Sequence, residues 1–324
     1  MKVAVLGATG AVGRTMLKVL EERDVPVDEL VPLASARSAG ASVCFRGREW
    51  PVREPAADAF AGCAIALFSA GAERSREWAP VAAEAGAVVI DNSSAWRTDP
   101  EVPLVVPEIN AAAAAQRPRG IIANPNCATI QLVVVLEAIR RRVRLRRVVA
   151  TTFQSVSGAG EAGIAALRGE RSGERVESPF VAPIDGNVIP WIGPRGEDGW
   201  NEEERKIRME TRRILDLPEL PVAATCVRVP VEVGHAISAT VELSRSISRD
   251  DARAALARMP GIIVCDEASD PLPRDVAGRD SILVGHLRLD PDLENALHLW
   301  IVADNLRKGA ATNAVQIAQA VIDA

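Results

Sequence analysis

The 324-residue sequence contains no tyrosine, and aromatic residues make up only 3% of it. It has three histidines and five cysteines, so few side chains are available for imidazole or thiol chemistry. No two cysteines have the C-x-x-C spacing of a zinc site or a redox motif. Their odd number and scattered positions argue against a disulfide framework. We therefore expect a cytoplasmic protein with reduced thiols and no metal ion.

Long apolar runs and an excess of positive charge are also missing. No apolar segment approaches the ~18 residues that a membrane-spanning helix needs. The glycines of MKVAVLGATG interrupt the N-terminal run too early for a secretory signal. The formal net charge of −5 argues against a general nucleic-acid binder. One exception is AIRRRVRLRRVVA, residues 138–150, which we interpret as the solvated, cation-rich end of a helix; a basic binding patch is the alternative.

The composition that remains is that of a globular protein. Hydrophobic residues make up 48% of the chain and charged residues 25%, so there is apolar material for sizeable cores. A chain of this length is long for a single core, and we expect two domains.

The N-terminal segment has the pattern of a strand, a glycine turn and a helix. KVAVL, residues 2–6, predicts a buried parallel strand, and a helical pattern follows the glycine motif at residues 14–23. Such a turn lets the backbone approach a pyrophosphate at a helix N-terminus. The G-x-x-G-x-x-G spacing is a weak signal alone, and an ordinary tight turn is the alternative. The candidate cofactor contacts in it are Gly7, Thr9, Gly10, Ala11, Val12 and Gly13.

The segment after the second predicted strand, LVPLASARSAG at residues 30–40, lacks an acidic residue. An NAD-binding domain usually places Asp or Glu here to hold the ribose 2′-hydroxyl. Ser35, Arg37 and Ser38 instead offer a cation and hydroxyl groups, which suit a 2′-phosphate. The sequence therefore favours NADP(H), with an ordinary polar loop as the alternative.

Further strand-like runs at residues 64–71 and 87–94 flank a helical segment, and residues 105–110 and 120–127 continue the alternation. Strands that alternate with helices predict an α/β fold with a doubly wound parallel sheet. Ligands bind at the carboxyl ends of such strands. We therefore add these candidate cofactor contacts: Ser69, Ala70, Gly71 and Asn92.

The stretch ANPNCATIQ, residues 123–131, places a cysteine at a predicted helix start. Pro125 disfavours helix for the residue before it, and Asn126 is a good N-cap. Free backbone N–H groups and the positive end of the helix dipole would favour a thiolate at Cys127. The sequence thus predicts a nucleophile, although most free cysteines are simply small buried residues.

A thiol nucleophile needs a proton partner, and histidine is the usual one. His298 lies in an apolar strand pattern and reads as a packed core residue, and His286 lies in a similar pattern. His235 follows a glycine at an element boundary, where site residues tend to gather. We therefore predict that His235 is the partner of Cys127.

Ten segments, in this order, resemble the aspartate-β-semialdehyde dehydrogenase family almost from end to end. They are GATGAVG, SARSAG, SAG, DNSSAWR, VPEIN, NPNCAT, FQSVSGAG, EEERKIRMET, CVRVPVEVGHA and DNLRKGAATNAVQIA. The resemblance implies a Rossmann-type NADP-binding domain at residues 1–126, completed by a C-terminal helix at 305–324. It implies a mixed α/β catalytic and dimerisation domain at residues 127–304, and a homodimer or tetramer.

The resemblance also implies roles for individual residues. Cys127 would be the nucleophile, His235 the general acid/base and Gln154 the residue that orients the thioester. Arg228 would bind the substrate α-carboxylate, and Glu203 the α-ammonium group. The phosphate-binding groups would be Lys206, Arg97 and Asn126, and further cofactor contacts would be Ser157, Gly158 and Asn305. Without the resemblance, the helix pattern of residues 202–215 would read as a solvated charged face.

The activity that the resemblance implies is the NADP-dependent interconversion of L-β-aspartyl phosphate and L-aspartate-β-semialdehyde through a cysteine thioester. This reaction supplies the synthesis of lysine, threonine and methionine. The alternatives are an N-acetyl-γ-glutamyl-phosphate or malonyl-CoA reductase, whose substrates carry no free α-ammonium group, and an inactive NADP-binding paralogue. An RNA-binding protein would rest on the arginine cluster alone.

Overall fold

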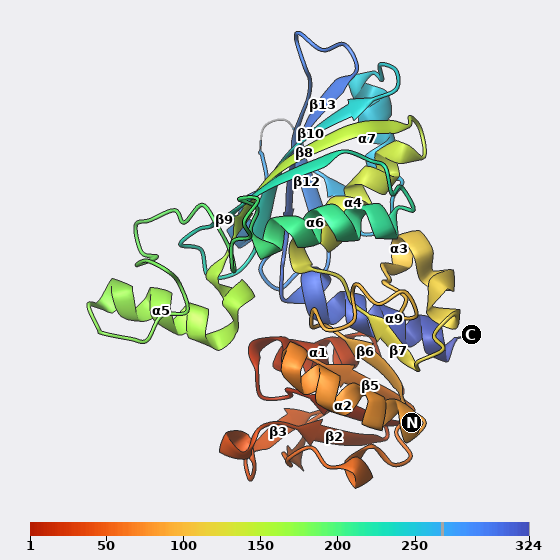
Figure 1. Cartoon of the computed structure of the whole chain (residues 1–324), viewed down its shortest axis with the longest axis vertical. Coiled ribbons are helices and arrows are strands. Elements are labelled where there is room, and N and C mark those ends of the chain that lie inside the picture. The colour runs from red at the N-terminus through yellow and green to blue at the C-terminus, as the bar shows by residue number, and fades with distance from the viewer. Residues whose placement is uncertain (267–268, 324) are drawn as a thin grey trace. The chain divides into compact units, whose positions relative to one another are not determined.

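The computed structural model describes residues 1–266 and 269–323. They form two compact units, shown with their element labels in Figure 1. The N-terminal unit contains residues 1–125 together with 310–324, and the C-terminal unit contains residues 126–309.

The N-terminal unit is built on a parallel sheet with the strand order β2-β1-β5-β6-β7. Its elements are β1 (Lys2–Leu6), α1 (Ala11–Glu22), β2 (Glu29–Leu33), β5 (Ile65–Phe68), α2 (Ala72–Glu84), β6 (Val88–Asp91) and β7 (Ile121–Ala123), with a small hairpin of β3 (Ser42–Phe45) and β4 (Arg48–Pro51). The β-branched and aliphatic side chains of the central strands are almost completely buried. Burial on both faces is typical of a parallel sheet, and the predicted doubly wound fold is confirmed.

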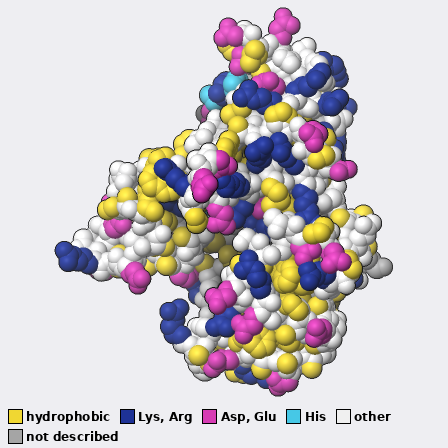
Figure 2. Space-filling view, viewed as in Figure 1, with side chains coloured by type: hydrophobic (Ala, Val, Ile, Leu, Met, Phe, Trp, Pro, Cys, Tyr) yellow, Lys and Arg dark blue, Asp and Glu magenta, His cyan; other side chains and the backbone are white. Residues whose placement is uncertain are grey.

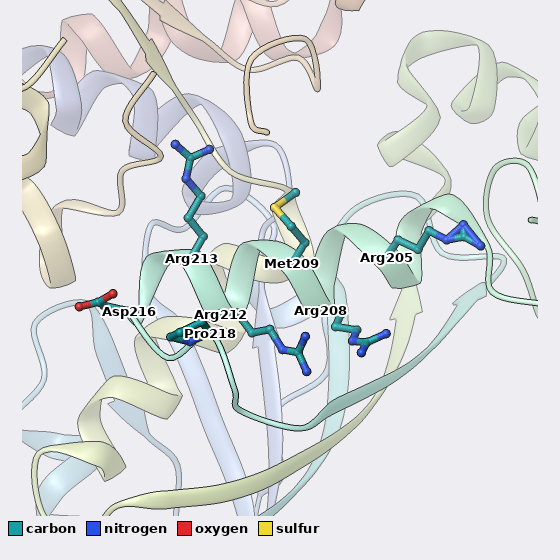
Figure 3. Close-up of a pocket in the computed structure, with 7 residues that line it drawn as sticks. All are labelled: Arg205, Arg208, Met209, Arg212, Arg213, Asp216 and Pro218. Atoms are coloured by element: carbon teal, nitrogen blue, oxygen red, sulfur yellow. The ribbon is translucent and has the colours of Figure 1, made fainter. Parts of the chain in front are cut away.

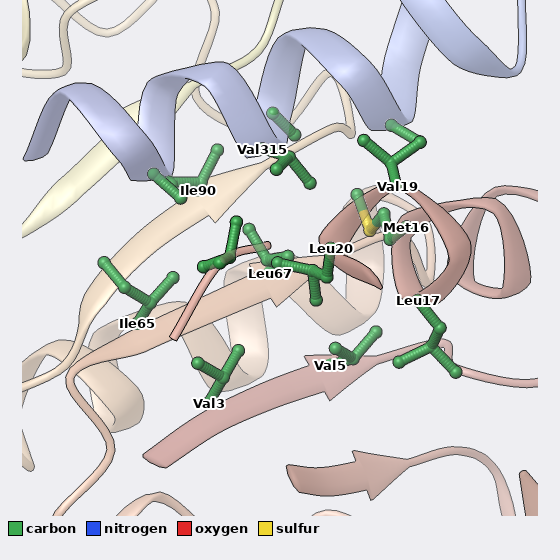
Figure 4. Close-up of a cluster of buried hydrophobic side chains, with 14 of the residues drawn as sticks. Val3, Val5, Met16, Leu17, Val19, Leu20, Ile65, Leu67, Ile90 and Val315 are labelled. Carbon is green, nitrogen blue, oxygen red and sulfur yellow. The ribbon is translucent and has the colours of Figure 1, made fainter. Parts of the chain in front are cut away.

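Helices cover both faces of this sheet. On one face, Met16, Leu17 and Leu20 of α1 pack in a core cluster with Val3 and Val5 of β1 (Figure 4). On the other face, the ring of Phe60 lies 6.0 Å from that of Phe68 in β5 and 6.2 Å from that of Trp78 in α2. The strands therefore end in loops at one edge of a fixed platform, where a cofactor would bind.

The C-terminal helix α9 (Thr312–Ile322) belongs to the N-terminal unit. Its Val315, labelled in Figure 4, is buried in the same core cluster as β1 and α1. Ala318 belongs to this cluster as well. Ile322, the last residue of α9, is 37% exposed. This helix completes the core of a unit whose other elements all lie within residues 1–125.

Residues 105–110 do not continue the strand pattern as expected. They include the short helix α3 (Pro107–Asn110), which leads into a 3₁₀ turn at Ala111–Ala115. Pro107 stands at the first position of α3, where its fixed φ suits a helix and its missing N–H costs nothing. Only Leu104, just before this segment, forms a bridge with Ala123.

The C-terminal unit is built on a mixed six-stranded sheet with the order β11-β12-β13-β10-β8-β9. Its elements are α4 (Cys127–Arg140), β8 (Leu145–Gln154), α5 (Gly160–Ser172), α6 (Glu202–Ile214), β9 (Val222–Arg228), β10 (His235–Leu243), α7 (Arg249–Ala257), β11 (Ile262–Val264), α8 (Pro273–Val276), β12 (Ile282–Leu289) and β13 (Ala296–Ala303). A π-helical turn, Arg307–Ala311, connects β13 to α9.

One face of this six-stranded sheet is covered and the other is partly open. Along β10, Ile237, Ala239 and Val241 are fully buried, whereas the alternate residue Ser238 is exposed. Thr225 of β9 is exposed in the same way. Since successive strand residues point to opposite faces, the helices α4, α6 and α7 cover one face and leave the second accessible in the single chain.

The arginine cluster lies at the end of α4, in the following turn and at the start of β8. Arg140 and Arg141 both bind the Glu137 carboxylate, at 2.6 and 2.9 Å, as expected for a cation-rich helix end. Arg147 binds Glu242 across the sheet at 2.9 Å. Figure 2 shows acidic side chains interspersed among Lys and Arg on the visible face.

None of the helices among the described residues has the length and hydropathy that a crossing of the bilayer requires.

Candidate active site

The thiol of Cys127 stands at the N-terminus of α4, as the sequence predicts. The Asn126 side chain caps the helix, and its Oδ1 accepts the backbone N–H groups of Ala128 and Thr129 at 2.9 and 3.2 Å. Most of α4 is buried, but Cys127 itself is partly exposed. A sulfur at this position can meet a ligand while the helix dipole favours negative charge on it.

His235 begins β10, and its Nε2 lies 3.2 Å from Cys127 Sγ. The two residues are 108 positions apart in the sequence, and the structure brings them into contact as predicted. His235 is completely buried. Burial, together with the nearby charge of Arg228, lowers the pKa of His235 to about 3, so the ring is neutral at physiological pH.

A buried carboxylate, Glu203, connects three other predicted residues. Its Oε1 accepts hydrogen bonds from Asn126 Nδ2 at 2.7 Å and from Gln154 Nε2 at 3.0 Å, and its Oε2 lies 3.5 Å from Lys206 Nζ. Burial disfavours the charged form, but Lys206, these hydrogen bonds and Arg228 outweigh it and lower the pKa of Glu203. The N-terminus of α6 is therefore not a solvated face; it supplies an ionised acid to the site.

Arg228 is the last residue of β9, and its Nη1 donates to the backbone carbonyl of Ser155 at 2.7 Å. Its guanidinium carbon lies 5.7 Å from the centroid of the Phe180 ring. Burial lowers the pKa of Arg228 from its usual value, although the negative charge of Glu203 opposes the change. A buried arginine with an acid beside it matches both ends of a zwitterionic substrate.

The predicted cofactor contacts Ser157 and Asn305 are bound to each other. Asn305 Nδ2 donates to Ser157 Oγ at 2.9 Å, and Asn305 Oδ1 accepts the N–H of Gly234 at 2.9 Å. Gly158 lies against Arg228: a Cβ at this glycine would stand 2.8 Å from Arg228 Nη1. These three residues are thus packed beside the His235 imidazole, Gly158 directly and the other two through Ser155.

The glycine turn between β1 and α1 has the close packing that a phosphate-binding turn needs. A Cβ at Gly13 would lie 2.1 Å from the carbonyl oxygen of Gly7, and Gly7 has a φ of +89°. A Cβ at Gly10 would meet only the Gly7 oxygen, at 3.4 Å, so its outer side is open. The turn therefore fits a dinucleotide, whose phosphates would approach the backbone around Gly10 and the N-terminus of α1, the segment that includes Thr9, Ala11 and Val12.

The other predicted cofactor contacts of the N-terminal unit follow the ends of its strands. Ser35, Arg37 and Ser38 lie in and beside a 3₁₀ turn after β2, and Thr9 Oγ1 donates to Ser38 Oγ at 3.3 Å. Ser69, Ala70 and Gly71 follow β5, and Asn92 follows β6 and donates to the Phe68 carbonyl at 3.1 Å. The sheet thus brings these loops to its carboxyl edge.

Arg97, predicted to bind phosphate, lies in the N-terminal unit and is buried. Its Nε donates to the Asn124 carbonyl at 3.0 Å, and its Nη2 donates to the Asn92 carbonyl at 2.7 Å. These contacts join the loops after β6 and β7. Arg97 therefore has a structural role, whatever else it binds.

Sequence reasoning missed Glu210, a completely buried acid in the middle of α6. Its Oε2 accepts the backbone N–H of Asn126 at 2.6 Å, which fixes the residue that caps α4. The signal was its position seven residues after Glu203, because residues seven apart share a helix face.

The two other histidines are not partners of Cys127. His286 is exposed on β12 and lies 2.9 Å from Asp270. The expectation that His298 is a packed core residue is wrong: its ring is partly exposed and contacts Thr240 and Asp290 at 2.9 and 2.7 Å. Polar partners on both ring nitrogens explain why it tolerates a surface position.

A groove of about 630 Å³ runs along the outward face of α6, and four arginines line it: Arg205, Arg208, Arg212 and Arg213 (Figure 3). None of the predicted catalytic residues lines this groove. Within residues 1–266 and 269–323, no cluster of three His, Cys, Asp or Glu side chains has the arrangement of a metal site.

Comparison with known proteins gives two matching families. Residues 2–117 match the semialdehyde dehydrogenase NAD binding domain, and residues 136–308 match the semialdehyde dehydrogenase dimerisation domain. The chain is 49% identical over 332 residues to the aspartate-semialdehyde dehydrogenase of Aquifex aeolicus, with 99% of this chain and 98% of the relative covered. It is 44% identical over 338 residues to that of Bacillus subtilis, with 99% and 97% covered.

Among solved structures, aspartate semialdehyde dehydrogenase II of Vibrio cholerae complexed with ASA has the same architecture. The TM-score is 0.95 at 47% sequence identity, and the match covers 99% of this chain and 98% of that one. The similarity therefore includes both units and the segments that carry the thiol and the imidazole.

Proposed function

The chain belongs to the aspartate-semialdehyde dehydrogenase family of oxidoreductases, and from this premise we propose how its own residues perform the reaction. The enzyme reductively dephosphorylates L-β-aspartyl phosphate to L-aspartate-β-semialdehyde through a thioester on Cys127. The single observation that carries the proposal is the 3.2 Å contact between Cys127 Sγ and His235 Nε2 at a capped helix start. The product supplies amino-acid biosynthesis.

The thiol divides the exchange into two easier steps. In the biosynthetic direction, Cys127 displaces phosphate from the acyl phosphate and becomes acylated. Gln154 orients the thioester; its Nε2 donates a hydrogen bond to Glu203 and its Oε1 accepts one from the Thr152 hydroxyl, which supports this position. His235 faces the reacting sulfur. Its imidazole interacts with the substrate oxygen that becomes negatively charged during the reaction.

The substrate is held at both ends. Arg228 binds its α-carboxylate through a fork of N–H donors, and Glu203 binds its α-ammonium group. In the C-terminal unit, Lys206 and Asn126 bind the phosphate. Lys206 and Asn126 are in contact with Glu203 in the described structure, so substrate binding exchanges these contacts for contacts to the ligand. Fixing both ends of the substrate lowers the entropic cost of the reaction.

The cofactor of the N-terminal unit is NADP(H). The absence of an acid after β2 and the exposed Arg37 between two serines support a 2′-phosphate site. When bound, NADP(H) supplies the nicotinamide that exchanges a hydride with the substrate. Arg37→Ala tests this: we expect the preference for NADPH over NADH to fall at least about tenfold, because a charge-assisted contact is lost. An unchanged preference would rule out this 2′-phosphate site.

The substrate is tested by NADPH formation from L-aspartate-β-semialdehyde, NADP⁺ and phosphate. N-acetyl-glutamate semialdehyde is the competing substrate, because it lacks the free ammonium group that Glu203 would bind. We expect phosphate-dependent turnover of the aspartyl compound alone. Turnover of the acetylated compound alone would keep the thiol chemistry and overturn the substrate. Turnover of neither, with tight NADP binding, would favour the inactive paralogue.

We also propose that the cytoplasmic enzyme is a homodimer. The match of residues 136–308 to a dimerisation domain supports this, as does the open face of the six-stranded sheet that carries Ser238 and Thr225. Light scattering is expected to give twice the mass of the chain. Ser238→Arg is expected to shift the protein towards the monomer, because it places a charge on that face. The matched control is Ser246→Arg, at an exposed position beyond the end of β10.

A further inference from the structure

Thr152 lies in β8, two residues before Gln154, so the two side chains point to the same face of the sheet. Thr152 Oγ1 donates to Gln154 Oε1 at 3.0 Å, and Gln154 Nε2 donates to Glu203 Oε1 at 3.0 Å. All three side chains are buried. Solvent therefore does not compete for these contacts.

The backbone at the start of α4 fixes the direction of these hydrogen bonds. The N–H groups of Ala128 and Thr129 donate to Asn126 Oδ1, so Nδ2 is the end of the Asn126 amide that faces Glu203. An amide nitrogen can only donate, and Glu203 Oε1 therefore accepts, at 2.7 Å. The same carboxylate oxygen faces the amide of Gln154.

The charge of Glu203 decides which end of the Gln154 amide it meets. Burial disfavours that charge, but Lys206 and the hydrogen bonds outweigh it and lower the pKa of Glu203. An ionised carboxylate has no proton to donate. The reverse orientation of the amide would place two buried acceptors against each other, at a large desolvation cost. The nitrogen of Gln154 therefore faces Glu203, and its oxygen faces Thr152.

Thr152 has one hydroxyl proton, and the Gln154 oxygen is its acceptor. The other neighbour is Cys226, directly opposite Thr152 in the parallel pair of β8 and β9. Burial raises the pKa of Cys226, although its interaction with the Thr152 hydroxyl opposes the change, so the sulfur keeps its own proton. A protonated sulfur is a weak acceptor, whereas an amide oxygen is a strong one. The proton of Thr152 therefore goes to Gln154.

The nitrogen of Gln154 also borders the place of the chemistry. It carries two protons, and Glu203 takes one of them. The nitrogen lies 3.5 Å from His235 Nε2, at the outer limit of a hydrogen bond, and that ring nitrogen is 3.2 Å from Cys127 Sγ. An acyl group on Cys127 would therefore lie beside the second N–H of Gln154.

We propose that Thr152 is a positioning residue, which turns the N–H donors of Gln154, and not its carbonyl oxygen, towards the reacting acyl group. An N–H stabilises the negative charge that develops on the acyl oxygen, whereas a carbonyl oxygen would repel it. The identity of the reacting group comes from the proposed function, which this role of Thr152 deepens.

Thr152→Val tests this role, because valine has nearly the shape of threonine but leaves Gln154 Oε1 buried without a donor. We expect kcat to fall about tenfold, the scale of one buried hydrogen bond. KM for L-aspartate-β-semialdehyde should change less than about threefold, because Arg228 and Glu203 keep their charges.

Thr152→Ser restores the hydroxyl and is expected to keep kcat within about twofold of the natural enzyme. An unchanged kcat in Thr152→Val would refute the role of Thr152. An equal fall in the serine and valine variants would refute it as well, because the shape of the side chain and not its hydroxyl would then matter.

Thr211→Val is the matched control. Thr211 in α6 is also completely buried, and its hydroxyl has no hydrogen-bond partner within the part of the chain that the structure describes. Its removal is expected to leave kcat unchanged. A loss as large as that in Thr152→Val would mean that turnover responds to any buried hydroxyl in this region, which contradicts a specific role for Thr152.

Nitrogen-15 spectra of protein labelled in the glutamine side chains test the orientation without any assay of turnover. The chain has five glutamines, and Gln154→Met identifies the signal of Gln154. We expect one Gln154 amide proton downfield of those of the exposed Gln116, because it meets a buried carboxylate. In Thr152→Val the amide is free to turn, and this proton should exchange with solvent at least about tenfold faster.

An unchanged exchange rate in Thr152→Val would overturn the proposal. If that variant does not fold, the natural protein still decides, because the absence of a downfield proton would mean that the Gln154 oxygen faces Glu203. Failure of the natural protein to turn over L-aspartate-β-semialdehyde would refute the proposed substrate and leave the spectral result standing.

Discussion

The two units build their predicted sites from different materials. In the N-terminal unit the glycine turn is a backbone structure, and Gly7 and Gly13 are fixed by steric contact within seven consecutive residues. In the C-terminal unit the site consists of buried side chains that bind one another, such as Glu203 with Asn126 and Gln154. Substitutions in the glycine turn should therefore lower stability and cofactor affinity. Substitutions in the side-chain network should instead lower turnover or substrate affinity.

The largest effect is expected at the thiol. Cys127→Ser keeps the helix cap and the volume of the side chain but replaces a thiolate by a weakly nucleophilic hydroxyl. We expect kcat to fall at least about 1,000-fold, with the affinity for NADPH unchanged. Turnover and cofactor fluorescence measure the two quantities. Residual activity within tenfold of the natural enzyme would mean that the thioester is not formed on Cys127.

A substitution in the glycine turn should instead lower stability and the affinity for NADPH. In Gly13→Ala the new Cβ would lie 2.1 Å from the Gly7 oxygen, so the turn must move. We expect the free energy of unfolding to fall by roughly 3 kcal/mol, the upper end for overpacking, together with loss of NADPH affinity. Urea unfolding and titration with NADPH measure these changes.

Gly10→Ala is the matched variant within the same turn. Gly10 has a φ of −78°, which any residue adopts, and its Cβ would meet only one atom at 3.4 Å. We expect stability to change by less than about 0.5 kcal/mol while NADPH affinity falls about tenfold. Equal stability losses in both variants would contradict the steric account of the turn.

A smaller effect is expected at Glu203, where the network meets the substrate. Glu203→Gln removes the charge that Asn126, Gln154 and Lys206 surround. We expect KM for L-aspartate-β-semialdehyde to rise about 10–100-fold, the range for a hydrogen bond to a charged group. The control is Glu202→Gln, an exposed acid that also binds Lys206, at 2.8 Å; it should change KM less than about threefold. Equal effects of the two variants would mean that only the charge near Lys206 matters.

The last prediction concerns the dependence of stability on pH. The pKa of His235 is lowered from 6.5 to about 3 in the folded protein. Between these values the unfolded chain binds a proton that the folded chain does not. The contribution of His235 to the free energy of unfolding is therefore fully present above about pH 6.5, and below this pH it falls by about 1.4 kcal/mol per pH unit. His235→Gln should remove this part of the slope between about pH 6 and 4 in urea unfolding. An identical slope in both proteins would mean that His235 titrates normally.

The sequence correctly predicted features that depend on residues close together in the chain. The Asn-Pro-Asn pattern before Cys127 located the start of α4, because a cap and a proline act within a few positions. The same kind of reasoning failed where contacts with distant parts of the chain determine the local structure or the surroundings of a side chain. Residues 105–110 have an apolar pattern, but Pro107 starts a helix there. His298 lies in an apolar run, but its two ring nitrogens contact the hydroxyl of Thr240 and the carboxylate of Asp290.

The parts of the candidate site that could not be predicted are contacts over a long distance in the sequence. Nothing around Ser155 indicates that its N–H would meet a ring 80 residues away. Glu210 reads as a solvated helix residue until the fold places it on the backbone of Asn126, 84 positions away. The burial of Glu203 became a prediction only through resemblance to a family, because its charged neighbours favour solvent.

The position of α9 has a consequence for how the chain is made. Val315 and Ala318 lie in the core of the N-terminal unit, yet a ribosome adds them after all of residues 126–309. During translation, the strand β1 and the helix α1 emerge early with part of their apolar surface uncovered. The C-terminal unit, whose residues form one uninterrupted segment, can fold before that core is closed. The first unit to leave the ribosome is thus the last to have its core completed.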